Sequence, residues 1–495
     1  MSTPWFDYSS LDSDQATMFT DDGDGLAGFA PAGAVDALNK ALTAGADINN
    51  PGSSAGEGFP LRMESLDRTL FNVTYSAKNI KFWKAIHKDR AYNTVEEFNR
   101  LEEYGSGDSI YMGEGDLPIE DDSTYSRNYT KIKFMGTTRR VTHVMHTIKS
   151  AHGPAVARET VNGTLFMLKQ IERGLFNGDE RFVDVQFDGL ETLMMQAFGS
   201  TELDDGQYSG YEDDNVIDLR GEPLSEDHIA DLTERLVAEP NYGNPTDLWL
   251  PTGPVKDLSK IMYPKERYDL PAPSGGRAGI AINTIVTPFG DIRLNPSIFL
   301  PDSKAPGAAA SGKSSARPGT PTVSGITSPV YAGSSTTYFA AADAGSYYYK
   351  VTAGSRYGRS APVTSAQIAV SADDSVEIVV ADAGPNTSYY EVSRSDKDGA
   401  ASTCRTCFRV ARSAASQTVT DLNRFLPGTS KGYLLSQQAD VLKWKQLAPL
   451  TRMPLAVIDT SIRWMQIIYG AMQLMKPRYN GMFINIGKLP TGANA

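Results

Sequence analysis

Residues 154–176 read PAVARETVNGTLFMLKQIERGLF, the strongest helical signal in the chain. Apolar side chains recur there at the spacing of one helix face, at Val161, Leu165, Leu168, Ile171 and Leu175. Pro154 suits the first helical turn and Gly178 provides a stop. About 23 residues rising about 1.5 Å each make a rod of roughly 35 Å. Gly163 and Gly174 weaken such a helix by about 1 kcal/mol each, unless another backbone packs closely against them.

Before this helix, the sequence predicts a long hairpin that stands off the body. YSRNYTKIKFMGTTRRVTHVMHTI, residues 125–148, alternates with the two-residue period of a strand, which includes His143 and His146. Residues 105–123 are rich in turn formers and acids. Upstream of them, residues 96–104 are expected to form a short amphipathic helix.

After the long helix, helical and strand patterns alternate without regular strand–helix–strand units. Residues 226–239 predict a helix with Ser225 as its N-cap. Residues 244–262 predict a buried strand followed by a helix, and residues 288–301 predict another strand with sharp ends. This mixture favours the α+β class.

A Gly, Ala, Ser and Pro linker at 303–321 marks a break in composition, after which helical periodicity disappears. The β-rich runs that follow are TTYFAAA (336–342), SYYYKVTAGS (346–355), AQIAVSA (366–372), SVEIVVAD (375–382), SYYEVSRS (388–395), CFRVARS (407–413) and QTVTDLN (417–423). Seven such runs suit an antiparallel sandwich of about 100 residues. Because the mixed pattern returns from Pro427 onward, the sandwich is interpreted as an insertion into the first domain.

Composition narrows the classes of function. The 495 residues carry a formal net charge of -12, which argues against a surface devoted to nucleic acid, so that any DNA contact must be local. Residues 1–60 read as an acidic arm with one short helix at 34–45. The N-terminus lacks the pattern of a secretory signal, and there is no apolar run of about 20 residues, so the chain is expected to be soluble and made in the cytoplasm.

The order of these parts resembles the major capsid proteins of tailed phages with the Hong Kong type shell fold. The resemblance rests on the arm, the hairpin ending in TKIKFMG, the helix running to LFNGD, then FDGLETLM, TDLWLPTGPVKDLSK and RWMQIIYGAMQLMKP. It covers roughly residues 20–300 and 430–495. The implied layout is an N-terminal arm (1–60), an extended hairpin loop with its base (61–149), peripheral and axial domains with a spine helix (150–302), a linker (303–317), the inserted sandwich (318–425) and a return to the capsid domain (426–495).

The inserted sandwich resembles an immunoglobulin-like or fibronectin type III module. The segment SYYYKVTAGSRYGRSAPV carries the likeness, because an alternating aromatic strand ends there in a short turn and a Gly-x-Ser at Gly358, Arg359 and Ser360. The order of the remaining pieces departs from the usual order in such modules. A module on a long linker costs little closure entropy and would face outward from a shell.

The resemblance implies a structural protein and no enzyme. It implies self-assembly through hexamers and pentamers into the icosahedral head that encloses double-stranded DNA, with scaffolding, portal and decoration proteins as further partners and no membrane. The protein would be found in the virion after synthesis in the bacterial cytoplasm. The alternatives are another virion structural protein, an adhesin or carbohydrate-binding protein with a fibronectin-like module, and a glycoside hydrolase with an accessory module.

The patterns that could carry chemistry are weak, and neither cofactor nor metal is expected. The acids at 120–122 and 211–215 are interpreted as solvated turns, and Cys404 and Cys407 as small residues on a strand or turn. Candidate intersubunit contacts are Lys131, Lys133, Glu114, Asp116, Arg139 and Arg140. Ordinary ion pairing is favoured for Lys131 and Lys133 over a covalent crosslink, because no acceptor Asn or catalytic acid is identifiable.

Overall fold

The computed structural model describes residues 73–489, except 106–109, 116, 118–119, 151, 198–200, 203–207, 210–214, 267–281, 301–304, 307–315, 332–336 and 382–385. The chain divides into two units, Met1–Leu70 and Phe71–Ala495, and the description concerns the second. The expected arm at 1–60 with its helix at 34–45, the candidate Asp116 and most of the acids at 211–215 lie outside the described residues.

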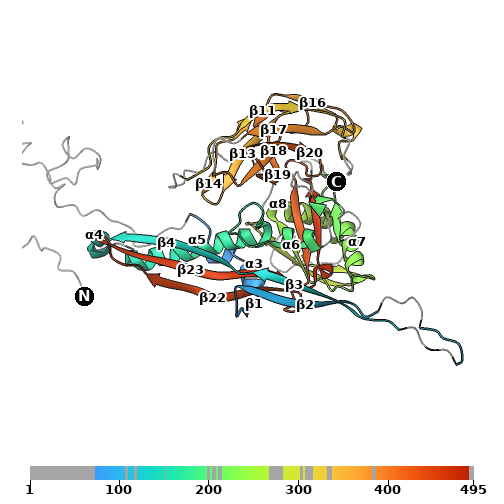
Figure 1. The fold of residues 1–495 in the computed structure, drawn as a ribbon, viewed down its shortest axis with the longest axis horizontal. Coiled ribbons are helices and arrows are strands. Elements are labelled where there is room, and N and C mark those ends of the chain that lie inside the picture. Colours follow the sequence, from blue (N-terminus) through green and yellow to red (C-terminus); the bar gives the residue numbers. More distant parts are fainter. Residues whose placement is uncertain are drawn as a thin grey trace, which may run out of the picture. The chain divides into compact units, whose positions relative to one another are not determined.

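The predicted long helix is present as α5 (Ala155–Asn177), and it packs on a four-stranded sheet (Figure 1). The sheet has the order β1 (His87–Arg90), β22 (Leu442–Pro454), β23 (Ser461–Leu474) and β4 (Lys133–Thr142). Neighbouring strands are antiparallel except β1 and β22, which are parallel. The mixture of helices and strands confirms the α+β class.

Gly163 explains how helix α5 approaches this sheet so closely. A Cβ atom at Gly163 would lie 2.1 Å from Oε1 of Gln466 on β23. The Gln466 Nε2 atom donates to the Thr160 carbonyl at 2.8 Å and to Thr164 Oγ1 at 3.2 Å. The expected close approach is therefore made here by a strand side chain, which binds the helix backbone.

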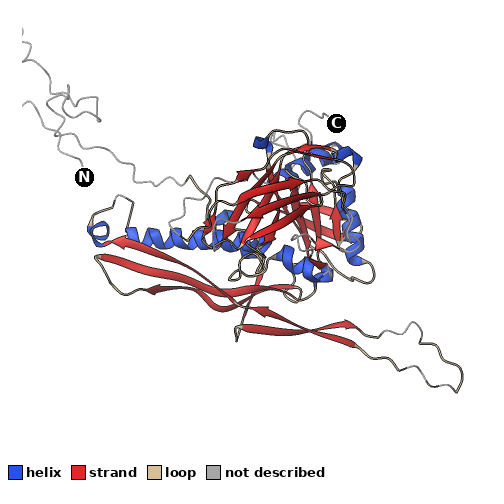
Figure 2. Cartoon of the chain, turned by 45° about the horizontal axis from the view of Figure 1, so that its top comes forward, coloured by secondary structure: helices blue, strands red, loops and turns tan. Residues whose placement is uncertain are grey.

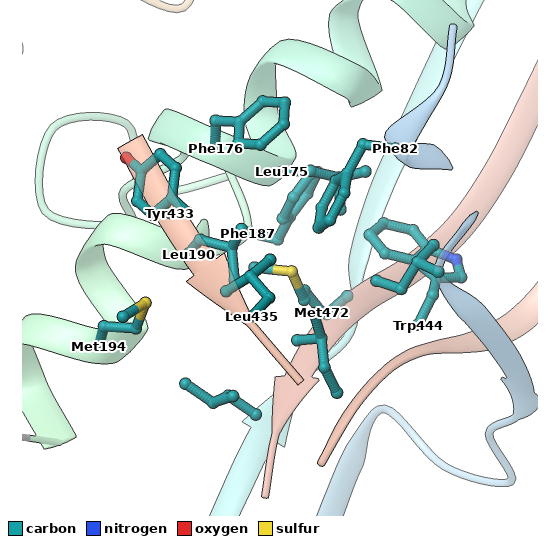
Figure 3. Packing of buried hydrophobic residues seen from close by; sticks show 14 of the residues in the cluster. Phe82, Leu175, Phe176, Phe187, Leu190, Met194, Tyr433, Leu435, Trp444 and Met472 are labelled. Atoms are coloured by element: carbon teal, nitrogen blue, oxygen red, sulfur yellow. The ribbon is translucent and has the colours of Figure 1, made fainter. Parts of the chain in front are cut away.

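The main core lies where the second half of α5 meets this sheet and a second one. Met167, Ile171, Leu175 and Phe176 are buried there, whereas Val161 at the other end of the expected stripe is exposed. Figure 3 shows Phe176 and Leu175 facing Tyr433, Phe82 and the strand that carries Met472. Helix α6 (Leu190–Ala197) closes the cluster through Leu190 and Met194.

The second sheet has six strands in the order β7 (Val216–Asp218), β24 (Gly481–Ile486), β21 (Ser430–Leu435), β8 (Asp247–Pro251), β10 (Gly290–Ser297) and β9 (Thr284–Thr287). Helices α7 (Glu226–Val237) and α8 (Thr252–Glu266) pack against it around a second apolar cluster. The helix expected at 226–239, the strand and helix expected at 244–262 and the strand expected at 288–301 are therefore confirmed.

A group of strands that we term the β-module follows between β11 (Thr322–Thr327) and β20 (Ser416–Asp421). One sheet has the order β11, β17 (Val376–Ala381), β20; the other has β14 (Gly358–Arg359), β13 (Tyr349–Ser355), β18 (Tyr389–Arg394), β19 (Arg405–Ala411), with β15 (Val363–Thr364) beside β13. Strands β12 (Gly345–Tyr347) and β16 (Ile368–Val370) form a separate pair. Both larger sheets bury side chains in one apolar cluster.

One expected run of the β-module is wrong. None of Thr337–Ala342, the described part of TTYFAAA, lies in a strand, and Ala341–Asp343 is a 3₁₀ turn. The physical reason is that Phe339 enters the core from a loop, which is attached by the Tyr338 amide to the Leu422 carbonyl at 2.9 Å. A buried aromatic side chain in the run therefore does not require a strand.

Strands β2 (Val95–Glu103) and β3 (Thr124–Lys131) form a two-stranded hairpin, which we term the hairpin ribbon (Figures 1 and 2). The helix expected at 96–104 is wrong, because Val95 to Leu101 pair residue by residue with Lys131 to Tyr125 and this pairing overrides the local helix pattern. Arg100 fastens the ribbon, since its Nε and Nη2 atoms donate to the carbonyls of Met475 and Leu474 at 2.6 and 2.8 Å.

The strand expected to continue through His143 and His146 is also wrong. β4 ends at Thr142, and His143–Thr147 is a short helix, α4. Thr142 Oγ1 accepts the Met145 amide at 3.4 Å, so a capping threonine begins the helix although the apolar alternation continues. Residues 73–86, with a 3₁₀ turn at Ala77–Asn79 and helix α3 (Phe82–Ala85), precede the sheet.

Candidate assembly surface

The predicted contacts Lys131 and Lys133 meet one carboxylate within the subunit. They flank Ile132, where β3 passes into β4, and their Nζ atoms lie 3.2 and 2.9 Å from Oε1 of Glu180. Lys133 also donates to the Asp184 carbonyl at 2.7 Å. The hairpin ribbon is thereby tied at its base to the loop that follows the long helix.

The pKa values around this pair agree with the ion pairing. A hydrogen bond to Glu180 raises the pKa of Lys131. Burial acts to raise the pKa of Glu180, but the hydrogen bonds from Lys133 and Lys131 outweigh it, and the pKa is lowered. Glu180 is therefore an anion at neutral pH, and reversing either lysine would place like charges together.

The loop that carries Glu180, residues 178–189, is itself tightly held. The Glu180 amide donates to Oδ1 of Asp188 at 2.9 Å, and the Gly189 amide donates to the Gly178 carbonyl at 2.8 Å. At Gly189 an added Cβ would lie 2.6 Å from the Gly174 carbonyl oxygen. Phe187 anchors the loop in the main core against Trp444, with ring centroids 5.1 Å apart.

Arg139 and Arg140 bind two other parts of the subunit. Arg139 Nη1 lies 3.4 Å from Oε2 of Glu159 on α5, and Arg140 Nη2 lies 2.8 Å from Oδ2 of Asp459 in the β22–β23 turn. Glu114 is exposed and has no ion pair with any described residue. Four of the six candidates therefore have partners in their own chain, and the five candidates within the described residues form no single cluster.

Exposed apolar side chains mark a surface that the charge pattern did not indicate. On the hairpin ribbon, Leu101 faces Tyr125 across the strands, and 41% and 70% of these side chains are exposed. Val95 and Tyr129 are exposed on the same face. Large exposed apolar patches are typical of interaction sites. The two-residue alternation of 125–131 could have revealed this face. It places Tyr125 and Tyr129 on the same side of the strand, and no apolar segment is predicted to cover that side.

A second exposed apolar group lies where β4 ends beside the β22–β23 turn. The His143 amide donates to the Thr460 carbonyl at 2.9 Å, which joins α4 to that turn. The large exposed apolar residues there are Val144, Met145, Ile148, Val457 and Ile458. We term this group the apolar tip.

The described parts of the chain contain no candidate metal site. Among these residues, no group of three or more His, Cys, Asp or Glu side chains could hold a metal ion. Cys404 and Cys407 are free, and they lie at a turn and on β19, as expected. The described helices include none with the length and apolar character needed to cross a membrane.

Comparison with known families shows what kind of protein carries this surface. A family model described as the SU10 major capsid protein matches residues 42–310, just over half of the 495 residues. The chain belongs to this family. Its function is that of a major capsid protein, which forms the shell of a phage head and acts in the virion. The family is structural and is no class of enzyme.

Two sequence relatives of this SU10 major capsid family member are themselves major capsid proteins. The major capsid proteins of Staphylococcus phage K and Staphylococcus phage S25-3 are each 23% identical over 437 residues, which cover 84% of this chain and 88% of theirs. A capsid chain of an empty GTA particle is 10% identical with a TM-score of 0.45 and covers 87% of this chain and 97% of its own. A Mycobacterium phage Bobi structure is 9% identical with a TM-score of 0.42 and covers 89% and 99%.

Proposed function

We propose that the subunit assembles as hexamers and pentamers into an icosahedral head around double-stranded DNA, and that the hairpin ribbon is its principal intersubunit element. The supporting observation is that the exposed face of the ribbon carries large apolar side chains at both ends, on either side of the Glu97–Arg127 ion pair. A two-stranded hairpin without a packed face is marginally stable in water. Burial against a neighbouring copy would remove Leu101, Tyr125 and Tyr129 from water and stabilise the ribbon at the same time.

Under this proposal, four of the six candidate residues support the assembly surface from within the subunit, and two stay candidates for direct contact with a neighbour. Ion pairs within the subunit hold the base of the ribbon through Lys131 and Lys133. They hold strand β4 through Arg139 and Arg140. Glu114 is exposed near the end of the ribbon and stays a direct candidate together with Asp116. Scaffolding, portal and decoration proteins are further partners under this proposal.

We also propose that residues 318–425 are an inserted immunoglobulin-like domain on the outer face of the shell. Strand register supports the insertion: β10 and β21 both pair with β8, and the C-terminal end of β10 and the N-terminal part of β21 lie beside the same end of β8. The chain thus leaves and re-enters one sheet at the same end of its strands, the geometry under which insertions are tolerated.

Specific contacts hold the β-module to the rest of the subunit. Arg220 donates from Nη1 to the Asn423 carbonyl at 2.8 Å and from Nη2 to the Tyr338 carbonyl at 3.0 Å. Arg409 on β19 donates to the Asn177 carbonyl at 3.1 Å and lies over the ring of Phe182. We infer that these two sets of contacts hold the β-module in one orientation against the rest of the subunit. The apolar core of the module is nevertheless separate from the other cores.

The experiment is to replace residues 318–425 by a short Gly/Ser linker. Because the deletion uncovers Phe182, the variant also carries Phe182→Gln, and the full chain with Phe182→Gln alone is the matched control. We expect shells that lack density on the outer face, and an excised module that folds as a β-protein. If the deletion aggregates while the control assembles, and the excised piece is unfolded, the insertion is an integral part of the shell.

A further inference from the structure

Residues 76–90 form a basic segment of an acidic chain. They read SAKNIKFWKAIHKDR, with Lys78, Lys81, Lys84, Lys88 and Arg90 against the single acid Asp89, whereas the whole chain has a formal net charge of -12. Clustered cations without acids beside them create a local positive potential that attracts anionic partners.

The fold places these cations on the surface. The apolar residues between them, Ile80, Phe82 and Ile86, are buried. Lys78, Lys81, Lys84, Lys88 and Arg90 are all exposed. We term these five residues the basic face.

The acids close to the basic face are already bound to other groups. Asp89 lies 2.7 Å from Nζ of Lys445 and 3.5 Å from Nζ of Lys443, both on β22. Glu172 lies buried beneath the segment, where its carboxylate accepts the amides of Phe82 at 2.8 Å and Trp83 at 2.7 Å. Among the described residues, no carboxylate forms an ion pair with Lys78, Lys81 or Lys84.

The position of the segment indicates which partner it meets. β1, which carries Lys88 and Arg90, is an edge strand of the four-stranded sheet, and in Figure 1 this edge lies on the side away from the β-module. If the β-module is on the outer face of the shell, as proposed above, this side is turned to the interior. The anionic polymer inside a phage head is its packaged DNA.

We propose that the basic face binds the phosphate backbone of the enclosed double-stranded DNA. Lysine suits this task because its ammonium is a hydrated point charge that attracts phosphate without reading sequence. One subunit would bind weakly, since the net charge of -12 opposes the approach of DNA. Many copies on one shell would act together on one polymer.

The test is duplex binding by the full-length, unassembled subunit. Fluorescence anisotropy of a labelled 30-base-pair duplex is measured across a salt series for the wild type and for Lys78→Gln/Lys81→Gln/Lys84→Gln. Because each phosphate contact contributes about 0.9 to the slope of log affinity against log salt, we expect the slope to become shallower by roughly 2.7 and the affinity at 0.15 M salt to fall roughly 10- to 100-fold. Circular dichroism confirms that the variant is folded.

The matched control removes three exposed lysines elsewhere, in Lys256→Gln/Lys260→Gln/Lys397→Gln, and is expected to change the slope by less than about 1. Equal loss in both variants, or no loss in the first, overturns the proposal. A competing occupant is the acidic segment at 1–60. If the wild type does not bind duplex, whereas Asp21→Asn/Asp22→Asn/Asp24→Asn does, that segment occupies the basic face and the proposal is wrong.

This inference rests on the proposed outward position of the β-module, but the two can fail separately. Microscopy of the deletion particle tests the position of the module, and the salt series in solution tests the basic face without any shell. A duplex-binding basic face together with a module on the inner side would keep the affinity for DNA but overturn its assignment to the enclosed genome, because the basic face would then be turned outward.

Discussion

The β-module and the hairpin ribbon are both antiparallel β-structure, yet they satisfy their apolar residues in opposite ways. Both larger sheets of the β-module bury side chains in one core, which includes Tyr349, Val392 and Ile378. The hairpin ribbon pairs strands just as regularly, but Leu101, Tyr125 and Tyr129 are exposed. The first structure is therefore packed within the subunit, whereas the second, under the proposed function, is completed by a neighbouring copy.

A buried charge network distinguishes the interior of the β-module further. Arg394 Nη1 lies 2.6 Å from Oδ2 of Asp421, and Tyr349 donates its hydroxyl to the same oxygen at 2.9 Å. The Arg394 guanidinium lies over the rings of Phe339 and Tyr347. Because neither charged partner is reached by water, the network is the place where a single substitution does the most damage.

The largest effect is expected from breaking that network. Asp421→Ala leaves Arg394 buried without its counter-charge, which costs about 3–5 kcal/mol. Urea unfolding of the excised module, once it is shown to fold, measures this loss. Arg394→Leu/Asp421→Ala is the control, and we expect it to recover part of the loss because no charge stays buried unpaired. A double variant that is less stable than Asp421→Ala by the full cost of a second break would contradict this account.

The next largest effect is expected in the loop at 178–189, which holds the base of the hairpin ribbon through Glu180. Gly189→Ala forces a Cβ to within 2.6 Å of the Gly174 carbonyl and the Gly178 amide nitrogen, so the loop that carries Glu180 must shift. We expect a loss of about 1–3 kcal/mol in the free energy of unfolding of the subunit. Gly253→Ala is the matched control, since an added Cβ there meets nothing within 4 Å. Equal stability of the two variants would show that the loop is pliable.

Substitution of exposed apolar side chains on the hairpin ribbon and on the β-module compares their importance for assembly. Leu101→Ser/Tyr125→Ser is expected to change the stability of the subunit by about 0.5 kcal/mol or less, because both side chains are exposed. Assembly, measured by light scattering and microscopy, should nevertheless be strongly reduced. Val330→Ser/Tyr357→Ser removes two exposed apolar side chains of the β-module and should leave assembly intact. Equal particle yields from both variants would remove the hairpin ribbon from the interface.

The smallest effect is a pH dependence at the base of the hairpin ribbon. The pKa of Glu180 is lowered in the folded subunit, so its ion pairs stabilise the fold above the unfolded value of about 4.3 and are lost as pH falls through the folded value. The Lys133 pair contributes about 1 kcal/mol or less. Thermal unfolding between pH 3 and 6 should show this loss in the wild type and a smaller one in Glu180→Gln. Identical profiles would show that the ion pair contributes nothing.

Periodic patterns predicted the elements whose burial agrees with local sequence. The long helix at 155–177 and the strand and helix at 247–266 follow the apolar spacing that burial requires. The segment at 96–104 could not be predicted in this way, because its strand depends on pairing with residues 124–131 farther along the chain. Tertiary pairing of that kind leaves little trace in a local pattern.

The candidate site was predicted only in outline. The sequence placed the relevant charges on the hairpin and its base, but a charge pattern carries no information on whether the partner lies in the same subunit. Glu180 is 49 residues from Lys131, and only the fold brings them together. The exposed apolar face was within reach of sequence reasoning, since Tyr125 and Tyr129 alternate on one side of a predicted strand.

The central claim is that assembly covers the hairpin ribbon and leaves the β-module exposed. Amide hydrogen exchange followed by mass spectrometry, on unassembled subunits and on shells of the same chain, tests it most directly. The account predicts that assembly slows exchange in residues 95–103 and 124–131 by at least about tenfold, while residues 322–421 exchange as before. Unchanged exchange in the hairpin ribbon, or protection confined to the β-module, would contradict it.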